Sequence, residues 1–171
     1  HANPRDPRSE KALELLKKFI PWEAKLCQKI GLTDRQATLH GSFTPVIRKP
    51  VFRLPCGKSI LGLGDSVILN DPIGGQGANI ACQAASFYLE KIKAHQNLLF
   101  TETWMHETFE LYWQQIAQWA VQWTNLLLNP SETLITLLKV ASTQANMADQ
   151  LADGFDNPAK LLSTSDHFKL K

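Results

Sequence analysis

The sequence predicts an α+β fold that is mainly α-helical, with a small group of two or three short strands around residues 40–64 and a C-terminal helical bundle. Apolar residues recur at spacings of three and four over residues 9–30, 77–95 and 102–152, which is the periodicity of amphipathic helices. Residues 38–64 instead contain short runs of β-formers that are separated by proline and glycine. A chain of 171 residues is long enough to bury a core of its own.

The changes between helical periodicity and runs of β-formers divide the chain into three segments, and we expect these to form one compact unit. They are a helical segment at 1–37, a segment of strands, loop and helix at 38–95, and a C-terminal helical region at 96–171.

The first helix is expected to run from Ser9 to Ile30. Ser9 is a suitable N-cap, because its hydroxyl can accept a bond from a free backbone N–H. Pro21 lacks an N–H and is predicted to kink or restart the helix, and Gly31 is a suitable C-cap.

The strand region predicts a hairpin. The runs VFRL and SILGLG are joined by PCGK, in which the Cys-Gly pair suits a tight turn. We expect one strand to end at Gly64, which places Asp65 at its carboxyl end, where ligands commonly bind in open sheets.

The rest of the chain predicts four helices. They are expected at 77–95, at 102–128, at 132 to about 152 after Pro130 and Ser131, and as a short helix from Asn157 and Pro158. The 102–128 helix carries an aromatic stripe, for which packed core is a better interpretation than an active-site wall.

Composition excludes several classes of function. The net charge of +2 is spread along the chain, so nucleic acid is not an expected partner. No apolar run reaches the roughly 18 residues of a membrane span, and a cytoplasmic location is expected. Cys27, Cys56 and Cys82 have no metal or redox spacing, and the histidines form no zinc motif, so no metal site is predicted.

The stretch GDSVILNDPIGGQGAN, residues 64–79, is the candidate site. A carboxylate at Asp65 can accept hydrogen bonds from hydroxyl groups, and Gly74, Gly75 and Gly77 allow positive φ and close backbone approach. The helix that follows directs free N–H groups and a positive dipole end towards a bound group. A purely structural glycine-rich loop explains the same residues equally well. Neither GxxxxGK[ST] nor GxGxxG is present, so phosphate-binding and dinucleotide fingerprints are absent.

The spacing resembles the second flavin-binding motif of the para-hydroxybenzoate hydroxylase class of flavoprotein monooxygenases. The matching positions are Gly64, Asp65, Pro72, Gly75, Gly77 and Asn79. The sequence LNDPIGGQGAN is similar to the corresponding loop of the styrene monooxygenase branch. Ile68 stands where the class usually has a histidine, and this too is similar to the styrene branch. The flanking HGSFTPVIRKP, RLPCGKSILGLGD and ADGFDNPAK are also similar to that branch, so the resemblance covers most of the chain.

The resemblance implies an FAD site. Asp65 would hydrogen-bond the ribityl chain, and backbone amides around Gln76, Gly77 and Ala78 would face N1 and O2 of the flavin. Pro72 would lie near the ring face where oxygen reacts. The residues implied to bind cofactor are Gly64, Asp65, Pro72, Gly75, Gln76, Gly77, Ala78 and Asn79.

The function implied by the resemblance is that of an FAD-dependent monooxygenase. Such an enzyme inserts oxygen into an aromatic, styrene- or indole-like substrate through a C4a-hydroperoxyflavin, with reduced FAD delivered by a separate flavin reductase. No catalytic acid or base is assigned. The alternatives are a halogenase or reductase of the same superfamily, and a non-enzymatic helical interaction module that retains the loop as a relic.

The family begins with a GxGxxG-bearing strand, and this chain contains no such motif. We therefore expect the C-terminal portion of a longer enzyme, with a partial FAD/NAD(P)-binding-type fold that lacks the N-terminal Rossmann βαβ unit. Such a chain is expected to bind FAD weakly or not at all, to be inactive by itself, and to expose apolar surface that favours a homodimer.

Overall fold

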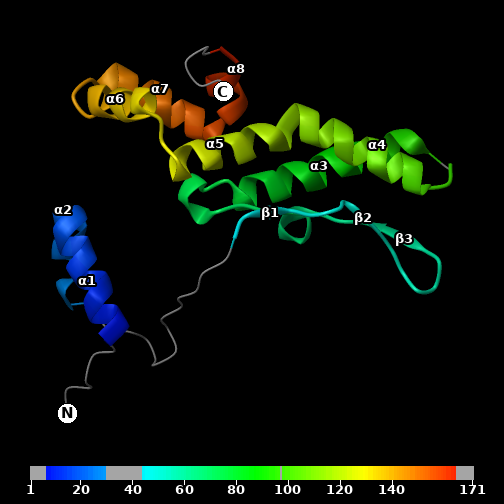
Figure 1. Cartoon of the computed structure of the whole chain (residues 1–171), viewed down its shortest axis with the longest axis horizontal. Coiled ribbons are helices and arrows are strands. Elements are labelled where there is room, and N and C mark those ends of the chain that lie inside the picture. The colour runs from blue at the N-terminus through cyan, green and yellow to red at the C-terminus, as the bar shows by residue number, and fades with distance from the viewer. Residues whose placement is uncertain (1–6, 30–43, 97, 165–171) are drawn as a thin grey trace. The chain divides into compact units, whose positions relative to one another are not determined.

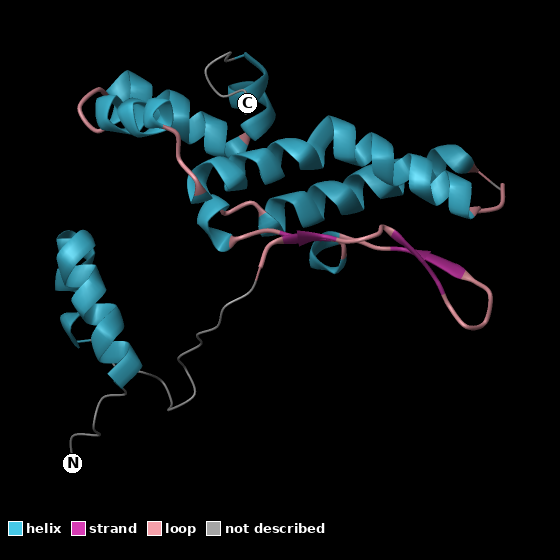
Figure 2. Cartoon of the chain, viewed as in Figure 1, coloured by secondary structure: helices cyan, strands magenta, loops and turns pink. Residues whose placement is uncertain are grey.

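The computed structural model describes residues 7–29, 44–96 and 98–164. Internal contacts divide the chain into two compact units, His1–Phe43 and Thr44–Lys171. Among the described residues, helices dominate both units, and the strands belong to the second (Figure 2). The mainly helical α+β class is therefore confirmed. The predicted strand residues at 38–43 and the Gly31 cap lie outside the described residues.

The first unit contains α1, Pro7–Phe19, and α2, Pro21–Leu26, followed by a 3-10 turn at Cys27–Lys29 (Figure 1). Pro21 is the first residue of α2, as its missing N–H requires. The predicted helix with a break at Pro21 is confirmed, but Ser9 as its N-cap is wrong, because α1 already begins at Pro7 and Ser9 lies in its first turn. Large apolar side chains on these helices are exposed, including Phe19, Trp22 and Leu26.

The predicted hairpin is confirmed in the second unit. β2, Val51–Arg53, pairs antiparallel with β3, Ser59–Leu61. The N–H of Leu54 donates to the carbonyl of Lys58 at 2.7 Å and closes the turn. Gly57 has a φ of +79°, which glycine adopts without steric cost.

A second strand pair was not predicted. β1, Val46–Ile47, pairs antiparallel with β4, Ile68–Leu69, which lies inside the stretch expected to be loop. Two-residue strands are too short to show an alternating pattern. The strand expected to end at Gly64 ends instead at Leu61, and that prediction is wrong.

The helix predicted at 77–95 is α3, Gly77–His95. α4, Glu102–Tyr112, continues through a π-helical stretch at Trp113–Ala117 into α5, Gln118–Leu128, and so confirms the helix predicted at 102–128. α8, Pro158–Thr164, confirms the short final helix.

The single helix predicted from 132 to about 152 is wrong, because two helices fill this range. α6 is Glu132–Ala141 and α7 is Ala145–Asp156. The hydroxyls of Ser142 and Thr143 donate to the carbonyls of Lys139 and Val140, at 2.7 and 3.0 Å. Such side-chain bonds compete with helical ones and favour an end at this point.

The main core lies where α3 packs on α4, the π-helical stretch and the Gly64–Ser66 turn. In Figure 1 the strands run along one side of α3 and the α4–α5 helix along the other. Tyr88 and Tyr112 meet edge to face with ring centroids 5.7 Å apart. The buried residues of this cluster are Val67, Ile68, Ile80, Ala84, Tyr88, Phe109, Tyr112, Ala117 and Ala120.

A second core joins α5 to the C-terminal helices. Trp123 is fully buried and meets Phe155 edge to face at 4.9 Å. Leu134 of α6 and Leu162 of α8 pack with Trp123 and Leu126 of α5. The burial of this aromatic stripe supports its interpretation as packed core. None of the helices at 7–29, 44–96 and 98–164 is long and apolar enough to cross a membrane.

Replacing Tyr112 with Phe is expected to lower the free energy of unfolding by about 1 kcal/mol, because the hydroxyl donates to the buried carbonyl of Ile80 at 2.7 Å. Urea denaturation monitored by tryptophan fluorescence measures this loss. Tyr88→Phe is the matched control, since no hydrogen bond of its hydroxyl exists within the described residues. Equal losses in the two variants would contradict the assignment.

Stability is also expected to fall in alkaline solution. Burial raises the pKa of Tyr88 from 10.0 to about 12 and raises that of Tyr112 further, with help from the neighbouring Tyr88. Both phenols ionise earlier in the unfolded chain, so their contribution is complete below pH 10.0 and is lost as the pH rises towards 12. Urea midpoints across this range test the decline. The double Phe variant is expected to show a flatter profile.

Candidate functional site

The Gly64–Ser66 segment forms a 3-10 turn that rests on α3. Gly64 has a φ of +57°, and a Cβ built there would lie 3.2 Å from the Cβ of Ala81. The Ser66 hydroxyl accepts from the N–H of Leu63 at 3.0 Å and donates to its carbonyl at 2.7 Å. Glycine is thus needed at position 64 both for its backbone angle and for close approach to the helix.

Asp65 lies in this turn and not directly at the end of a strand. Its backbone carbonyl accepts a hydrogen bond from Nη1 of Arg48 at 2.9 Å. Its carboxylate is exposed, and no residue of the described ranges pairs with it. The carboxylate is therefore available to accept hydrogen bonds from hydroxyl groups of a ligand.

A second 3-10 turn, Pro72–Gly74, follows β4. Oδ1 of Asp71 accepts from the N–H of Ile73 at 2.9 Å, so Asp71 caps this turn with Pro72 in its first position. Pro72 itself is exposed. Aspartate followed by proline is the sequence pattern that predicts such a cap, but the sequence prediction gave Asp71 no role.

The three loop glycines serve different purposes. Gly75 alone among them has a positive φ, +62°. A Cβ at Gly74 would lie 2.6 Å from Oγ1 of Thr124, so Gly74 permits the loop to touch α5. A Cβ at Gly75 or Gly77 would meet no atom within 4 Å, which leaves open space beside both.

Gln76 holds the loop to the C-terminal helices through its side chain. The side chain is buried, and its Nε2 donates to the carbonyl of Phe155 at 2.6 Å. Only the backbone of Gln76 is thus left to face a ligand. Sequence reasoning could not anticipate this contact, because the two residues are 79 positions apart.

The N-terminus of α3 presents unpaired donors. The first backbone bond of this end runs from the N–H of Ile80 to the carbonyl of Gln76 at 3.0 Å. The N–H groups of Gly77, Ala78 and Asn79 find no acceptor within the described part of the chain. α3 is 19 residues long, so its positive dipole end reinforces these donors.

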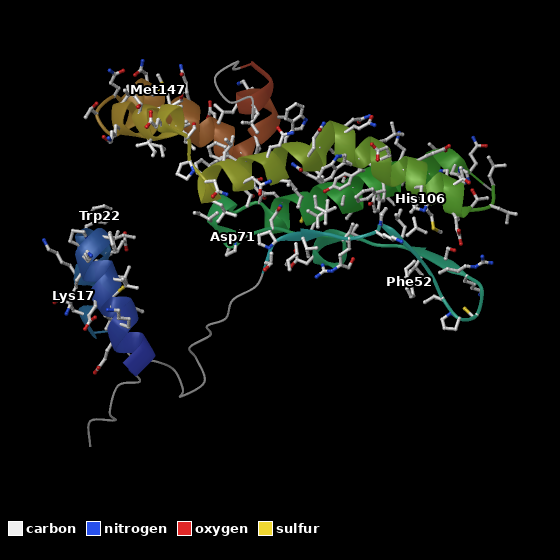
Figure 3. The ribbon with its side chains drawn as sticks, in the orientation of Figure 1. Lys17, Trp22, Phe52, Asp71, His106 and Met147 are labelled. Atoms are coloured by element: carbon white, nitrogen blue, oxygen red, sulfur yellow. The ribbon has the colours of Figure 1, made fainter. Side chains whose placement is uncertain are left out.

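The contact between Gly64 and Ala81 brings Asp65 beside the first turns of α3. The turn that carries Asp65 and the helix with the unpaired donors are therefore in contact, and the loop between them is labelled at Asp71 in Figure 3. This arrangement suits a ligand that has hydroxyl groups on one arm and an electron-rich edge. Asn70, which precedes Asp71 in the loop, has a buried Nδ2 without a partner in the described residues.

Other features do not compete with this site. A shallow depression of about 390 Å³ is lined by Pro50, His106, Glu107, Phe109 and Glu110, none of which belongs to the loop. Within the described residues, no group of three or more histidine, cysteine, aspartate or glutamate side chains could hold a metal ion.

Gly74→Ala is expected to destabilise the protein by about 1–3 kcal/mol, because its Cβ would overlap Oγ1 of Thr124. Thermal unfolding measures the change. Gly77→Ala is the matched control, since its Cβ meets open space and alanine favours a helix. A Gly74→Ala variant as stable as the control would show that the loop is not held against α5.

Comparison with known protein-family models gives no match. Among curated proteins, the chain is 32% identical over 166 residues to the styrene monooxygenase StyA of Pseudomonas fluorescens, covering 91% of this chain. It is 35% identical over 128 residues to StyA of a Pseudomonas species, covering 71% of this chain. The chain spans only 39% and 30% of the lengths of these relatives. It is therefore related to the styrene monooxygenases.

Proposed function

We propose that this chain is the C-terminal portion of an FAD-dependent monooxygenase, and that residues 64–79 hold the flavin. The observation that carries the proposal is that two kinds of polar group lack partners within the described residues. They are the carboxylate of Asp65 and the backbone N–H groups at the start of α3. The identity to two styrene monooxygenases supports the same reading.

The residues present suit the flavin end of FAD. Asp65 accepts hydrogen bonds from the ribityl hydroxyls, and the backbone amides of Gln76, Gly77 and Ala78 face the pyrimidine edge. The open space beside Gly75 and Gly77 admits a flat ring system close to the backbone. Gly64 and Asn79 complete the set, the first by seating the Asp65 turn on α3 and the second by adding an N–H donor.

Bound reduced flavin supplies the oxygen chemistry, in which one atom of dioxygen passes to the substrate. The protein positions the ring and excludes water. The dipole end of α3 stabilises negative charge at the pyrimidine edge, where the reduced ring is anionic. Pro72 flanks the ring without offering an N–H donor. None of the described side chains is assigned as an acid or a base.

The substrate is an aromatic molecule of the styrene or indole class, and a separate reductase delivers reduced flavin. Both assignments extend the name of the relatives, styrene monooxygenase, to this chain. Cys27, Cys56 and Cys82 are all unpaired, which suits a reducing cytoplasm. A homodimer belongs to the same proposal, because the surface exposes many large apolar side chains.

The nucleotide half of FAD is held by polypeptide outside this chain. The sequence has no GxGxxG turn, and the chain spans 39% of the length of one relative and 30% of the other. The chain by itself is therefore expected to bind flavin weakly and to be inactive.

Asp65→Ala is expected to weaken FAD binding at least about tenfold, because a hydrogen bond to a charged group is worth about 1.5–3 kcal/mol. Titration of FAD fluorescence measures the change in this chain, or in its longer natural form if the chain alone does not bind. Asp149→Ala, on the exposed face of α7, is the control and is expected to bind like the parent. Equal affinities of the two variants would contradict the flavin site. Absence of binding by the longer form as well would favour a non-enzymatic interaction module.

A further inference from the structure

The β2–β3 hairpin has two different faces. Its register places Phe52 opposite Ile60, with Val51 opposite Leu61 and Arg53 opposite Ser59. Side chains alternate along a strand, so Phe52 and Ile60 share one face and their four neighbours share the other. Figure 3 labels Phe52 on this hairpin.

The face that carries the neighbours is turned to α4 and the core. Leu61 packs against the main core cluster. The hydroxyl of Ser59 donates to Oε1 of Glu102 at the start of α4, and Nε of Arg53 lies 3.8 Å from the same oxygen. The face with Phe52 and Ile60 therefore points away from α4.

That outward face is apolar where a solvated face would be polar. Phe52 is 62% exposed and Ile60 is 47% exposed. Ile47 of β1 and Leu63 after β3 are also exposed, so apolar side chains continue along the strands. Antiparallel strands with one solvated face alternate apolar and polar residues, whereas strands that are apolar on both faces are covered on both.

The edges of these strands are open as well. Within the described residues, β2 pairs only with β3 and β1 pairs only with β4. Unpaired backbone groups on exposed strands are a template for an added strand. The exposed Lys49 and Lys58 lie before β2 and before β3, and they favour an acidic rim on whatever binds there.

We propose that this outward face is the docking surface for the part of the protein that the relatives carry and this chain lacks. The occupant is a polypeptide with an apolar face, an acidic rim and a strand that pairs with the open edge of the hairpin. The share of the relatives' lengths that this chain spans, 39% and 30%, leaves ample polypeptide for this role. The inference rests on the proposed function only in taking the chain as a portion of a longer enzyme.

The test compares the 171-residue chain with the longer protein encoded in frame upstream of it. Hydroxyl-radical footprinting with mass spectrometry measures the oxidation rates of Phe52 and Ile60 in both. Leu138 of α6, 42% exposed, is the control residue. We expect Phe52 and Ile60 to be oxidised several-fold more slowly in the longer protein, while the rate at Leu138 does not change.

A pair of variants tests the contact itself. Ile60→Ser in the longer protein is expected to restore rapid oxidation of Phe52, and Leu138→Ser is expected to leave it slow. Rapid oxidation of Phe52 in both forms would overturn the proposal, as would a stop codon in frame directly upstream. Slow oxidation in the 171-residue chain would also overturn it, and dependence of that rate on chain concentration would identify a second copy as the occupant.

Flavin affinity is measured on the same samples, which separates this inference from the proposed function. Protection of Phe52 without flavin binding would keep the docking surface and contradict the flavin site. Flavin binding without protection of Phe52 would keep the flavin site and contradict the docking surface.

Discussion

Close contact of backbone with helix, at two glycines, is the constraint on which the candidate site depends. Gly64 sets one end of the loop against Ala81 of α3, and Gly74 sets the other against Thr124 of α5. A Cβ at Gly64 would lie 3.2 Å from the Cβ of Ala81, and one at Gly74 would lie 2.6 Å from Oγ1 of Thr124, so either would force its neighbours to shift. Both ends of the loop are thus held against helices.

The fixed loop determines what the start of α3 can do. The side chain of Gln76 is hydrogen-bonded to Phe155 and therefore does not cover the start of the helix. Open space lies beside Gly75 and Gly77 at this point. The N–H groups at the start of α3 stay unpaired within the described residues. The side chain of Asp65 is exposed and that of Gln76 is already bonded, while the buried Nδ2 of Asn70 has no partner in the described residues. The residues that pack the loop are thus different from the donors and acceptors that face the open side.

The two sides of the second unit differ in how completely they are covered. α3 is packed against α4, the π-helical stretch and the Gly64–Ser66 turn, and Tyr112 ties the long helix to Ile80. The hairpin, by contrast, is packed on one face, while Phe52 and Ile60 on its other face are exposed. An exposed apolar face on a strand pair is the observation behind the docking surface proposed above.

Resemblance to a family motif singled out the loop at 64–79. The sequence alone determined most of the helices, the break at Pro21 and the hairpin. Each of these follows from local chemistry: helical periodicity, the missing N–H of proline, and turn residues between β-formers. Only the tertiary structure decided that β4 pairs with β1, that Gly74 is required by Thr124, and that Gln76 binds Phe155. These contacts join residues that are far apart in the chain, so no local pattern encodes them, and they depend on how the helices pack.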